Sequence, residues 1–555
     1  MDRWATGFAA PPLLQGPPRT LTTLSIIIPV SEASSMALRT TIDSVTAQSS
    51  PDWELCIVDD ASASDLGSQV RALASRDRRV RVARRTRPGG TAEASNDALA
   101  VSSGDFVAVV EPGDLLVKGT VEAVRRTLDD HPEADFCYSD EAEITPSGRL
   151  LNAFYKPDWS PERMRTQHYT GRLSAIRRTL ALQLGGYRPA FDACLDRELG
   201  LRVSENTRNI VHIAEVLYLR RVDEAPDPAG PDAATLDSRR RAIAEHCDRV
   251  GIEGVVEAIP SIGSFRVRRR LHDAPDVSIV IPTRGSASVI QGVRRIHVLH
   301  ALSSVIERST YPSFEIVLVA DRETPSAVID GMVDLCGDRL RLEWFDGPFN
   351  FSTKCNAGVA ASSGDVVILL NDDVEVLTPD WIETLTGFVQ EPDCGLAGCK
   401  LLTAFEPLQH GGVVWTPGAI VHAYANYPSD ERGMADLLCI DRECSGVTAA
   451  CAAIRRDVWE QIGGMCEALP INYNDVDLGL KVRSLGLRIV WTPHALLYHF
   501  ESLTRSRKND VSPSEVEFLE RRWLSWLRSD PYSNPNLDQL RGDWVVRRPP
   551  EHWVL

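Results

Sequence analysis

The sequence predicts two tandem α/β domains, each a Rossmann-like unit around a mostly parallel sheet, and three observations support this fold class. Short apolar segments such as 24–30 (LSIIIPV) alternate with stretches of helical periodicity. These segments are apolar throughout, which is typical of strands buried on both faces of a parallel sheet. The same series of segments occurs twice along 555 residues, a length that exceeds what one hydrophobic core usually supports.

The internal repeat defines the domain boundaries. NDALAVSSGDFVAVVEPGDLL, from Asn96, aligns without a gap on NAGVAASSGDVVILLNDDVEV, from Asn356. Further blocks match in the same order: LSIIIPV with VSIVIPT, PDWELCIVDD with PSFEIVLVAD, QLGGYR with QIGGMC, and DRELGLRV with DVDLGLKV. Because several ordered matches indicate a repeated domain, we expect a first domain at 23–225 and a second at 276–505.

The remaining segments lie outside the repeat. Residues 1–22 form a Pro-rich tail, and residues 226–275 form a connector in which RRRAIAEHCDRVG predicts a helix. Residues 506–555 predict a helix followed by an extended tail. Two Trp and a Leu at helical spacing in FLERRWLSWL predict that this helix packs on the second domain.

Composition excludes several classes of protein. Hydrophobic residues make up 43% and charged residues 25%, as in a soluble globular protein. The net charge of −17 argues against general affinity for nucleic acid or for an acidic membrane surface. We find neither a signal-peptide core nor an apolar run of the ~18 residues that span a bilayer. Twelve cysteines without a CxxC pair indicate a reducing compartment, so we expect a cytoplasmic chain.

One strand of the second domain ends on adjacent polar residues. VVILL (366–370) runs directly into Asn371, Asp372 and Asp373. Adjacent carboxylates repel each other unless water screens them or a cation neutralises them, and a solvated turn is the alternative interpretation. Because ligands of parallel sheets bind beyond the carboxyl ends of the strands, we favour a binding site. Other strand-end acids are Asp59, Asp60 and Asp321.

These motifs resemble those of a known family. SIIIPV, IVDDAS, NDALAVSSGDF, YSDE, LLNDDVEVL, QHGGVV, NDVDLGLKV, LLYHFES and DPYSNPNL are similar to motifs of the inverting family 2 glycosyltransferases of GT-A fold. The tandem-domain, rhamnosyltransferase-like enzymes of bacterial surface polysaccharide assembly are the subgroup that the chain most resembles. The resemblance covers nearly the whole chain outside the first 22 residues.

The resemblance implies transfer of a sugar from a nucleotide-diphosphate sugar to a hydroxyl of a glycan or lipid-linked saccharide. A lipid-linked acceptor would bring the chain to the inner face of the membrane. The sugar, the nucleotide, the linkage, processivity and the oligomeric state stay open.

The resemblance also implies a divalent metal, Mg²⁺ or Mn²⁺, on the departing diphosphate. Asp373 occupies the second acidic position of the DxD motif, and Asn371 stands where the family has the first Asp. His499 matches the later histidine of the metal shell, although a structural histidine is the alternative. Asp372 is expected to contact the donor sugar or ribose.

For the base that takes the acceptor proton, the resemblance implies Asp475, with Asp477 as a support. Acids in a first helical turn can also be plain partners of the helix dipole. Donor-binding positions are Pro282, Thr283, Arg284, Asp321 and Asn356, while Ala320 departs from Asp59 of the first domain. His410 is expected either on the acceptor side or in a structural role.

The first domain has lost metal-binding positions. Glu111 and Gly113 lie opposite Asn371 and Asp373, and Leu219 lies opposite His499. Asp59, Asp60, Asp196 and Glu198 are retained in this domain. We therefore expect it to be inactive or metal-independent.

Three alternatives compete with this interpretation. Glu111 and Asp114 could rebuild a metal site, which would allow a bifunctional enzyme. The protein could be a nucleotide-sugar-binding scaffold. A nucleotidyltransferase is disfavoured, because PVSEASS and PTRGSAS lack a basic Gly-rich loop.

Overall fold

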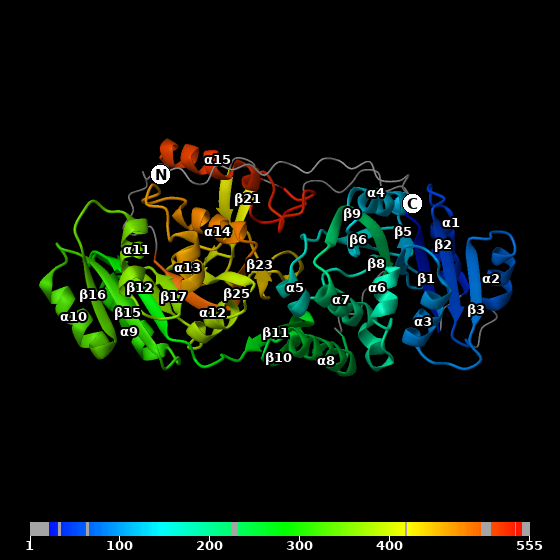
Figure 1. Cartoon of the computed structure of the whole chain (residues 1–555), viewed down its shortest axis with the longest axis horizontal. Coiled ribbons are helices and arrows are strands. Elements are labelled where there is room, and N and C mark those ends of the chain that lie inside the picture. Colours follow the sequence, from blue (N-terminus) through cyan, green and yellow to red (C-terminus); the bar gives the residue numbers. More distant parts are fainter. Residues whose placement is uncertain are drawn as a thin grey trace.

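The computed structural model describes residues 22–31, 35–62, 66–223, 231–416, 419–500, 512–538 and 540–546. The predicted N-terminal tail therefore lies outside the described residues, apart from Thr22. The two domains lie side by side along the long axis of the molecule, and the connector joins them along one side (Figure 1).

The described part of the first domain is built on a nine-stranded sheet. Four parallel strands form one half, in the order β3 (Val80–Arg84), β2 (Trp53–Asp59), β1 (Leu24–Val30) and β4 (Phe106–Val109). The mixed half continues with β8 (Ser174–Arg177), β6 (Phe136–Ile144), β9 (Ile210–Arg221) and β5 (Leu115–Leu116), and β7 (Leu150–Phe154) pairs with β6. Its helices are α1 (Ser35–Thr46), α2 (Leu66–Ala74), α3 (Thr91–Val101), α4 (Thr120–Asp130), α5 (Pro161–Thr166), α6 (Arg178–Gln183) and α7 (Leu195–Asn206).

The second domain repeats this strand order position by position. The parallel half is β16 (Leu340–Phe345), β15 (Phe314–Asp321), β12 (Val277–Thr283) and β17 (Val366–Leu370). The other half is β24 (Cys451–Arg455), β19 (Cys394–Leu402), β25 (Arg488–His499) and β18 (Val374–Val376), with β20 (Leu408–His410) on β19 and β23 (Arg442–Glu443) on β25. Its helices are α9 (His297–Arg308), α10 (Ser326–Cys336), α11 (Phe351–Ala361), α12 (Trp381–Val389), α13 (Arg456–Ile462) and α14 (Asn474–Ser484). The predicted tandem α/β architecture is confirmed.

The central strands are buried on both faces. Ile26 and Ile28 of β1 pack in one core, whereas Ile27 packs in the core on the opposite face. In β12, Ile279 and Val280 divide in the same way. Successive side chains of a strand point to opposite faces, so a strand between two helical layers must be apolar at every position.

The second domain contains a hairpin for which the first domain has no room. β13 (Ala287–Ile290) and β14 (Val293–Ile296) lie between β12 and α9, whereas only residues 31–34 separate β1 from α1. Gln291 and Gly292 form the turn with φ of 49° and 81°, as a tight two-residue hairpin turn requires. Ile290 packs on Ala404 and Phe500, which holds the hairpin against the main sheet.

The connector combines a helix with a hairpin. α8 (Ala233–Val250) covers the predicted helical segment, and β10 (Gly254–Ile259) pairs with β11 (Ser264–Arg269). Asp232 caps α8 by accepting a hydrogen bond from the Thr235 amide at 2.7 Å. The sequence analysis did not predict the hairpin.

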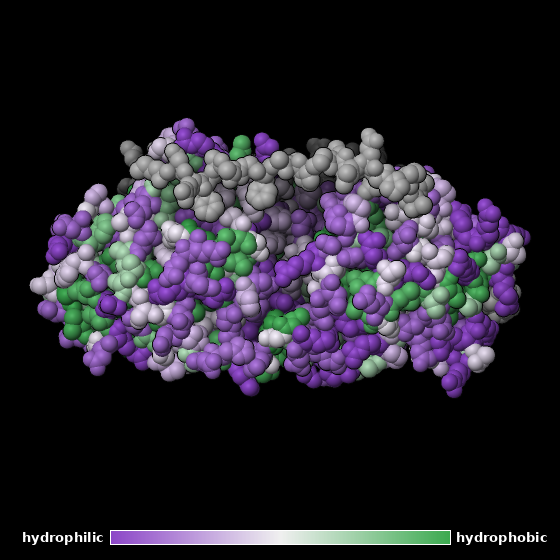
Figure 2. All heavy atoms as spheres, in the orientation of Figure 1, coloured by the Kyte–Doolittle hydropathy of each residue, from purple (hydrophilic) through white to green (hydrophobic). Residues whose placement is uncertain are grey.

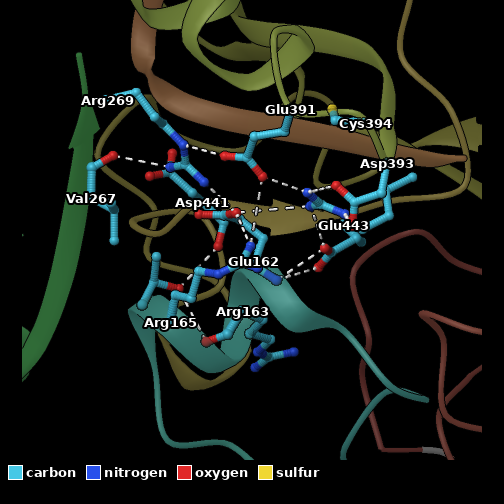
Figure 3. Close-up of polar contacts among 12 residues, drawn as sticks. Glu162, Arg163, Arg165, Val267, Arg269, Glu391, Asp393, Cys394, Asp441 and Glu443 are labelled. Carbon is cyan, nitrogen blue, oxygen red and sulfur yellow. Dashed lines mark hydrogen bonds and ion pairs between the residues drawn. The ribbon is translucent and has the colours of Figure 1, made fainter. Parts of the chain in front are cut away.

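A buried ion network joins the two domains through this connector. Glu162 of α5 is paired with Arg269 of β11 at 2.5 Å, and Arg269 also reaches Glu391 at 2.8 Å. Figure 3 shows these three side chains pointing toward one another. Arg488 of β25 pairs with Glu391 at 2.7 Å and with Glu443 at 3.0 Å. Because breaking a buried pair costs about 3–5 kcal/mol, this interdomain ion network favours one fixed arrangement of the domains.

The C-terminal segment also contacts both domains. Leu519 and Trp523 of α15 (Pro513–Leu527) pack with Val476 and Leu480 of α14, as the apolar spacing predicted. Further along, Asp530 accepts a hydrogen bond from Ser445 of the second domain at 2.6 Å. Residue Asn534 donates to Asp140 of the first domain at 2.8 Å.

The surface is mainly hydrophilic on the face drawn in Figure 2, where apolar side chains form small separate patches. None of the described helices combines the length and the apolar composition that crossing a bilayer requires.

Candidate functional site

Three adjacent parallel strands of the second domain bring predicted site residues to one sheet edge. β15 ends at Asp321, β12 ends at Thr283, and β17 ends immediately before the Asn371–Asp373 segment. Thr283 donates a hydrogen bond from Oγ1 to Oδ2 of Asp372 at 2.6 Å, which links the ends of β12 and β17.

A buried lysine connects two of these strand ends. Lys354 of α11 is 1% exposed, and its Nζ donates to the Thr283 carbonyl at 2.7 Å and to Asp321 Oδ1 at 2.9 Å. Pro282 is buried within β12, while Arg284 is exposed just beyond it. The edge therefore places a fixed basic group beside the carboxylates of Asp321 and Asp372.

His499 joins the Asn371–Asp373 segment from β25. Its Nε2 lies 3.2 Å from Asp373 Oδ1 and 3.0 Å from Asn371 Nδ2. On the other side of the ring, Nδ1 lies 2.7 Å from Gln409 Oε1. Since an amide oxygen can only accept, Nδ1 carries the proton and donates to Gln409. In the neutral ring Nε2 then accepts from Asn371 Nδ2, and only the protonated ring donates a second N–H toward Asp373.

The two aspartates have opposite pKa shifts. Burial, followed by repulsion from Asp373, raises the pKa of Asp372 to about 7. Burial also acts to raise the pKa of Asp373, but attraction and hydrogen bonding to His499 outweigh it, so that this pKa is lowered. Two neighbouring carboxylates repel each other when both are ionised, so one pKa rises while the other falls. Asp373 is the ionised member of this pair.

The donor set of this edge fits a hard divalent cation in part. Asp373 offers a carboxylate, His499 an imidazole nitrogen, and Asn371 a buried Oδ1 for which the described residues supply no hydrogen-bond partner. The described residues contain no ready group of three or more acidic, histidine or cysteine ligands. Mg²⁺ and Mn²⁺ sites usually leave positions for water and substrate phosphates, so an incomplete protein shell suits a metal that arrives with a diphosphate.

Asp475 lies in the first turn of α14 and is half-buried. Its Oδ1 accepts a hydrogen bond from the Val476 amide at 2.9 Å. Tyr473, which precedes the helix, has φ of 58°, a strained conformation for a large side chain. Within the part of the chain that the structure describes, no lysine or arginine pairs with Asp475, which leaves the second carboxylate oxygen available.

Asp477 is buried and bonded to other side chains of the protein. It is 0% exposed and accepts a hydrogen bond from Trp523 Nε1 at 2.8 Å, and Lys481 lies 3.3 Å from its Oδ2. Its counterpart Glu198 is also buried and pairs with Arg202 at 2.6 Å, again four residues on. The same device in both domains indicates that this acid anchors the helix, as the predicted supporting role requires.

Asn356 likewise has an exact counterpart. Its amide group bonds both backbone groups of Met465, at 2.9 and 3.0 Å. In the first domain, Asn96 does the same with Tyr187, at 2.7 Å for both bonds. These contacts explain the asparagine as a clamp on the loop after the Gly-Gly pair, and they occupy the side chain that the sequence analysis assigned to the donor.

His410 is directed into the core. It is 0% exposed, and its Nδ1 lies 2.8 Å from Nδ1 of His422. Burial lowers its pKa well below the ordinary value. These contacts favour the structural alternative over the acceptor role. The adjacent Gln409 contacts His499, because neighbouring residues of a strand point to opposite sides.

The first domain holds an arginine where the second domain has an alanine. Arg172 is ion-paired with Glu111, the counterpart of Asn371, and its Nη1 lies 4.0 Å from Asp196, the counterpart of Asp475. The aligned residue of the second domain is Ala450. Burial raises the pKa of Asp196 to about 6, although Arg172 opposes the shift. A guanidinium thus neutralises the acids that a metal and an acceptor would otherwise meet.

In the first domain, the two acids of the alternative metal site are paired with protein groups. Asp114 accepts hydrogen bonds from Tyr218 at 2.6 Å and from the Arg221 amide at 2.9 Å, and Glu111 is paired with Arg172. Both acids therefore have protein partners.

Sequence reasoning missed three residues of these sites: Gln409, Lys354 and Arg172. Gln409 lies in the QHGGVV motif, and strand alternation could have assigned it in place of His410. Lys354 and Arg172 replace Ala94 and Ala450 of the other domain. Both residues could have been found from the sequence, because each is a charged residue that aligns with an alanine of the other repeat.

Comparison with known proteins gives two family matches. A model described as "Glycosyl transferase family 2" matches residues 25–183, and one described as "Glycosyltransferase like family 2" matches residues 275–529. Each matched segment overlaps one of the two repeats.

Two curated relatives align along almost the whole chain. The uncharacterized protein y4gI of Sinorhizobium fredii is 34% identical over 549 residues, which is 96% of this chain and 59% of that protein. The O-antigen biosynthesis protein RfbC of Myxococcus xanthus is 35% identical over 546 residues, 95% of this chain and 41% of that protein. The chain thus spans only about half the length of these relatives. A solved structure of S. aureus TarS is 18% identical, with a TM-score of 0.33, over 40% of this chain and 65% of that one.

Proposed function

Because this chain belongs to glycosyltransferase family 2, we propose that it transfers a sugar from a nucleotide-diphosphate sugar to an acceptor hydroxyl, with the chemistry in the second domain. One observation carries the assignment to that domain. Asp373 and His499 lie together there with Asn371, whose Oδ1 has no partner among the described residues, whereas Arg172 neutralises the corresponding acids of the first domain.

Each residue of the second-domain edge has a proposed role. Thr283, Lys354, Asp321 and Asp372 form a hydrogen-bonded group that orients the donor, with Pro282 and Arg284 beside it. Asp373, Asn371 and His499 would hold Mg²⁺ or Mn²⁺, which stabilises charge on the departing diphosphate when bound. Gln409 keeps the lone pair of His499 Nε2 toward that group.

Asp475 is the proposed base. Its half-buried carboxylate has an oxygen that no described basic residue neutralises, so it can accept the proton of the attacking hydroxyl. Asp477 contributes indirectly, because its bond to Trp523 holds the start of α14.

The proposed acceptor is a glycan or lipid-linked saccharide of a bacterial surface polysaccharide. The similarity to an O-antigen biosynthesis protein supports this class. A cytoplasmic location, with contact to the inner membrane face through the acceptor, belongs to the same proposal.

The proposal is tested by measuring release of nucleoside diphosphate from a panel of nucleotide sugars, with and without Mn²⁺. We expect a metal-dependent release that Asp373→Ala abolishes and Glu111→Ala largely retains. Equal losses in the two variants would favour a bifunctional enzyme. No release from any donor, combined with donor binding, would identify a scaffold.

A further inference from the structure

We propose that His297 is an additional ligand-binding residue of the second-domain site, where its imidazole contacts the metal–diphosphate group that Asp373 and His499 hold. This inference rests on the proposed function and adds a residue that no sequence motif of the site includes. His297 is the first residue of α9, directly after the β13–β14 hairpin.

His297 is a buried histidine without partners. It is 2% exposed, and neither ring nitrogen has a hydrogen-bond partner among the described residues. A buried imidazole normally satisfies at least one nitrogen, because leaving a polar atom unpaired costs about 1–3 kcal/mol. Two buried nitrogens that no described residue satisfies indicate a group that receives its partner from a ligand.

The repeat places this ring beside Asp373. The Leu116 amide donates to Ser44 Oγ at 3.2 Å in the first domain, and the Val376 amide donates to Ser304 Oγ at 3.1 Å in the second. This shared contact fixes the register between the helix and the strand end, and in that register Ala37 corresponds to His297.

The same register makes Gly113 the counterpart of Asp373. A β-carbon built on Gly113 would lie 3.7 Å from the β-carbon of Ala37. The Asp373 and His297 side chains therefore branch from neighbouring points. Consistent with this, each influences the pKa of the other.

The chemistry of the ring suits a cation–diphosphate ligand. The two ring nitrogens of a neutral imidazole differ in chemistry, because only one of them carries a proton. That form offers one lone pair to a divalent metal and one N–H to a phosphate oxygen. The described residues contain no group of three acidic, histidine or cysteine side chains that could hold a metal, so His297 would join Asp373 and His499 only through the ligand that they share.

Calorimetry of the whole chain with Mn²⁺ alone, and with Mn²⁺ plus UDP, tests the proposal. His297→Ala introduces the residue that the first domain has at this position, and His297→Phe keeps a ring without nitrogens. We expect both to weaken binding about tenfold or more. His300→Ala is the matched control, because His300 lies one turn on and pairs with Glu375 at 2.8 Å.

A loss with Mn²⁺ alone would identify a direct metal bond, and a loss only with UDP would identify a hydrogen bond to the diphosphate; either supports the proposal. Unchanged binding in both variants, at unchanged melting temperature, would overturn it. Asp373→Ala distinguishes a failure of the His297 proposal from a failure of the proposed metal site. If it loses binding while the His297 variants keep it, only His297 is wrong, whereas retained binding in all variants would contradict the metal site itself.

Discussion

The two domains share one fold and one strand order but differ at the strand end that would carry chemistry. In the second domain, Asp373 and His499 approach each other and Ala450 occupies the position of the first-domain arginine. In the first, Gly113 and Leu219 remove those groups, and Arg172 pairs with Glu111 beside Asp196. The same fold can thus keep its hydrophobic cores and its asparagine clamps while a few residues at the strand ends change. In the first domain these changes place an arginine where the second domain would bind a ligand.

The largest expected effect separates the two candidate bases. Asp475→Asn should lower the rate of transfer to acceptor by ~10²- to 10⁴-fold with little change in donor binding, because the proton moves only in the transition state. Asp196→Asn, the matched change in the first domain, should leave the rate nearly unchanged. Steady-state kinetics with a saturating donor measures both. A fully active Asp475→Asn variant would move the base elsewhere.

Exchanging the arginine should alter the second site next. Ala450→Arg introduces a positive charge next to the Asn371–Asp373 segment, since the Ala450 carbonyl accepts from the Asn371 amide at 3.0 Å. A unit charge ~4 Å away is worth about 4 kcal/mol at an effective dielectric constant of 20. We expect Mn²⁺ binding in the presence of UDP to weaken by roughly 10²-fold or more. Ala450→Leu controls for size alone. If the leucine variant loses as much affinity, bulk rather than charge explains the difference between the domains.

Acid should weaken the interdomain ion network that holds the two domains in one arrangement. Burial acts to raise the pKa of Glu162, but Arg269 and Arg165 lower it to about 2. A carboxylate with a lowered folded pKa stabilises the protein above its unfolded pKa, and the contribution is lost as pH falls through the folded value. The contribution of Glu162 to the free energy of unfolding, about 3 kcal/mol, should therefore be lost as the pH falls from about 4.5 to 2.

Urea unfolding of the parent and of Glu162→Gln, followed from pH 7 downward, measures this contribution. The gap between the two proteins should be widest near neutrality and should close in acid. A gap that stays constant over the whole range would show that the ionised form of Glu162 adds nothing to the interface.

The smallest of these effects concerns the support of His499. Gln409→Ala removes the acceptor of its Nδ1–H, and outer-shell changes of this kind typically cost 10- to 100-fold in metal affinity or activity. We expect weaker Mn²⁺ binding at an unchanged melting temperature. Gln409→Glu, which retains an acceptor, should recover most of the loss, whereas equal losses in both variants would contradict the orienting role.

The repeat and the apolar strands were sufficient for the architecture. Segments such as LSIIIPV and VSIVIPT are apolar at most positions, which is typical of a strand covered on both faces, so tandem α/β domains followed from the sequence. The positions of Thr283, Asp321 and Asp373 at one edge followed as well, because parallel strands end together. The β10–β11 hairpin escaped prediction, since short paired strands carry little periodic signal.

What the sequence determined by itself was therefore the local pattern: which residues end strands, which begin helices, and which positions the two copies share. Only the tertiary structure decided which of those side chains face a ligand. Asn356 and Asp477 looked like site residues, but contacts with Met465 and Trp523 occupy them, and strand alternation turned His410 inward and Gln409 outward. The roles of Arg172 and His297 depend on neighbours that lie far away along the chain. Burial and pairing across such distances set the charge and availability of a side chain, and local sequence does not encode them.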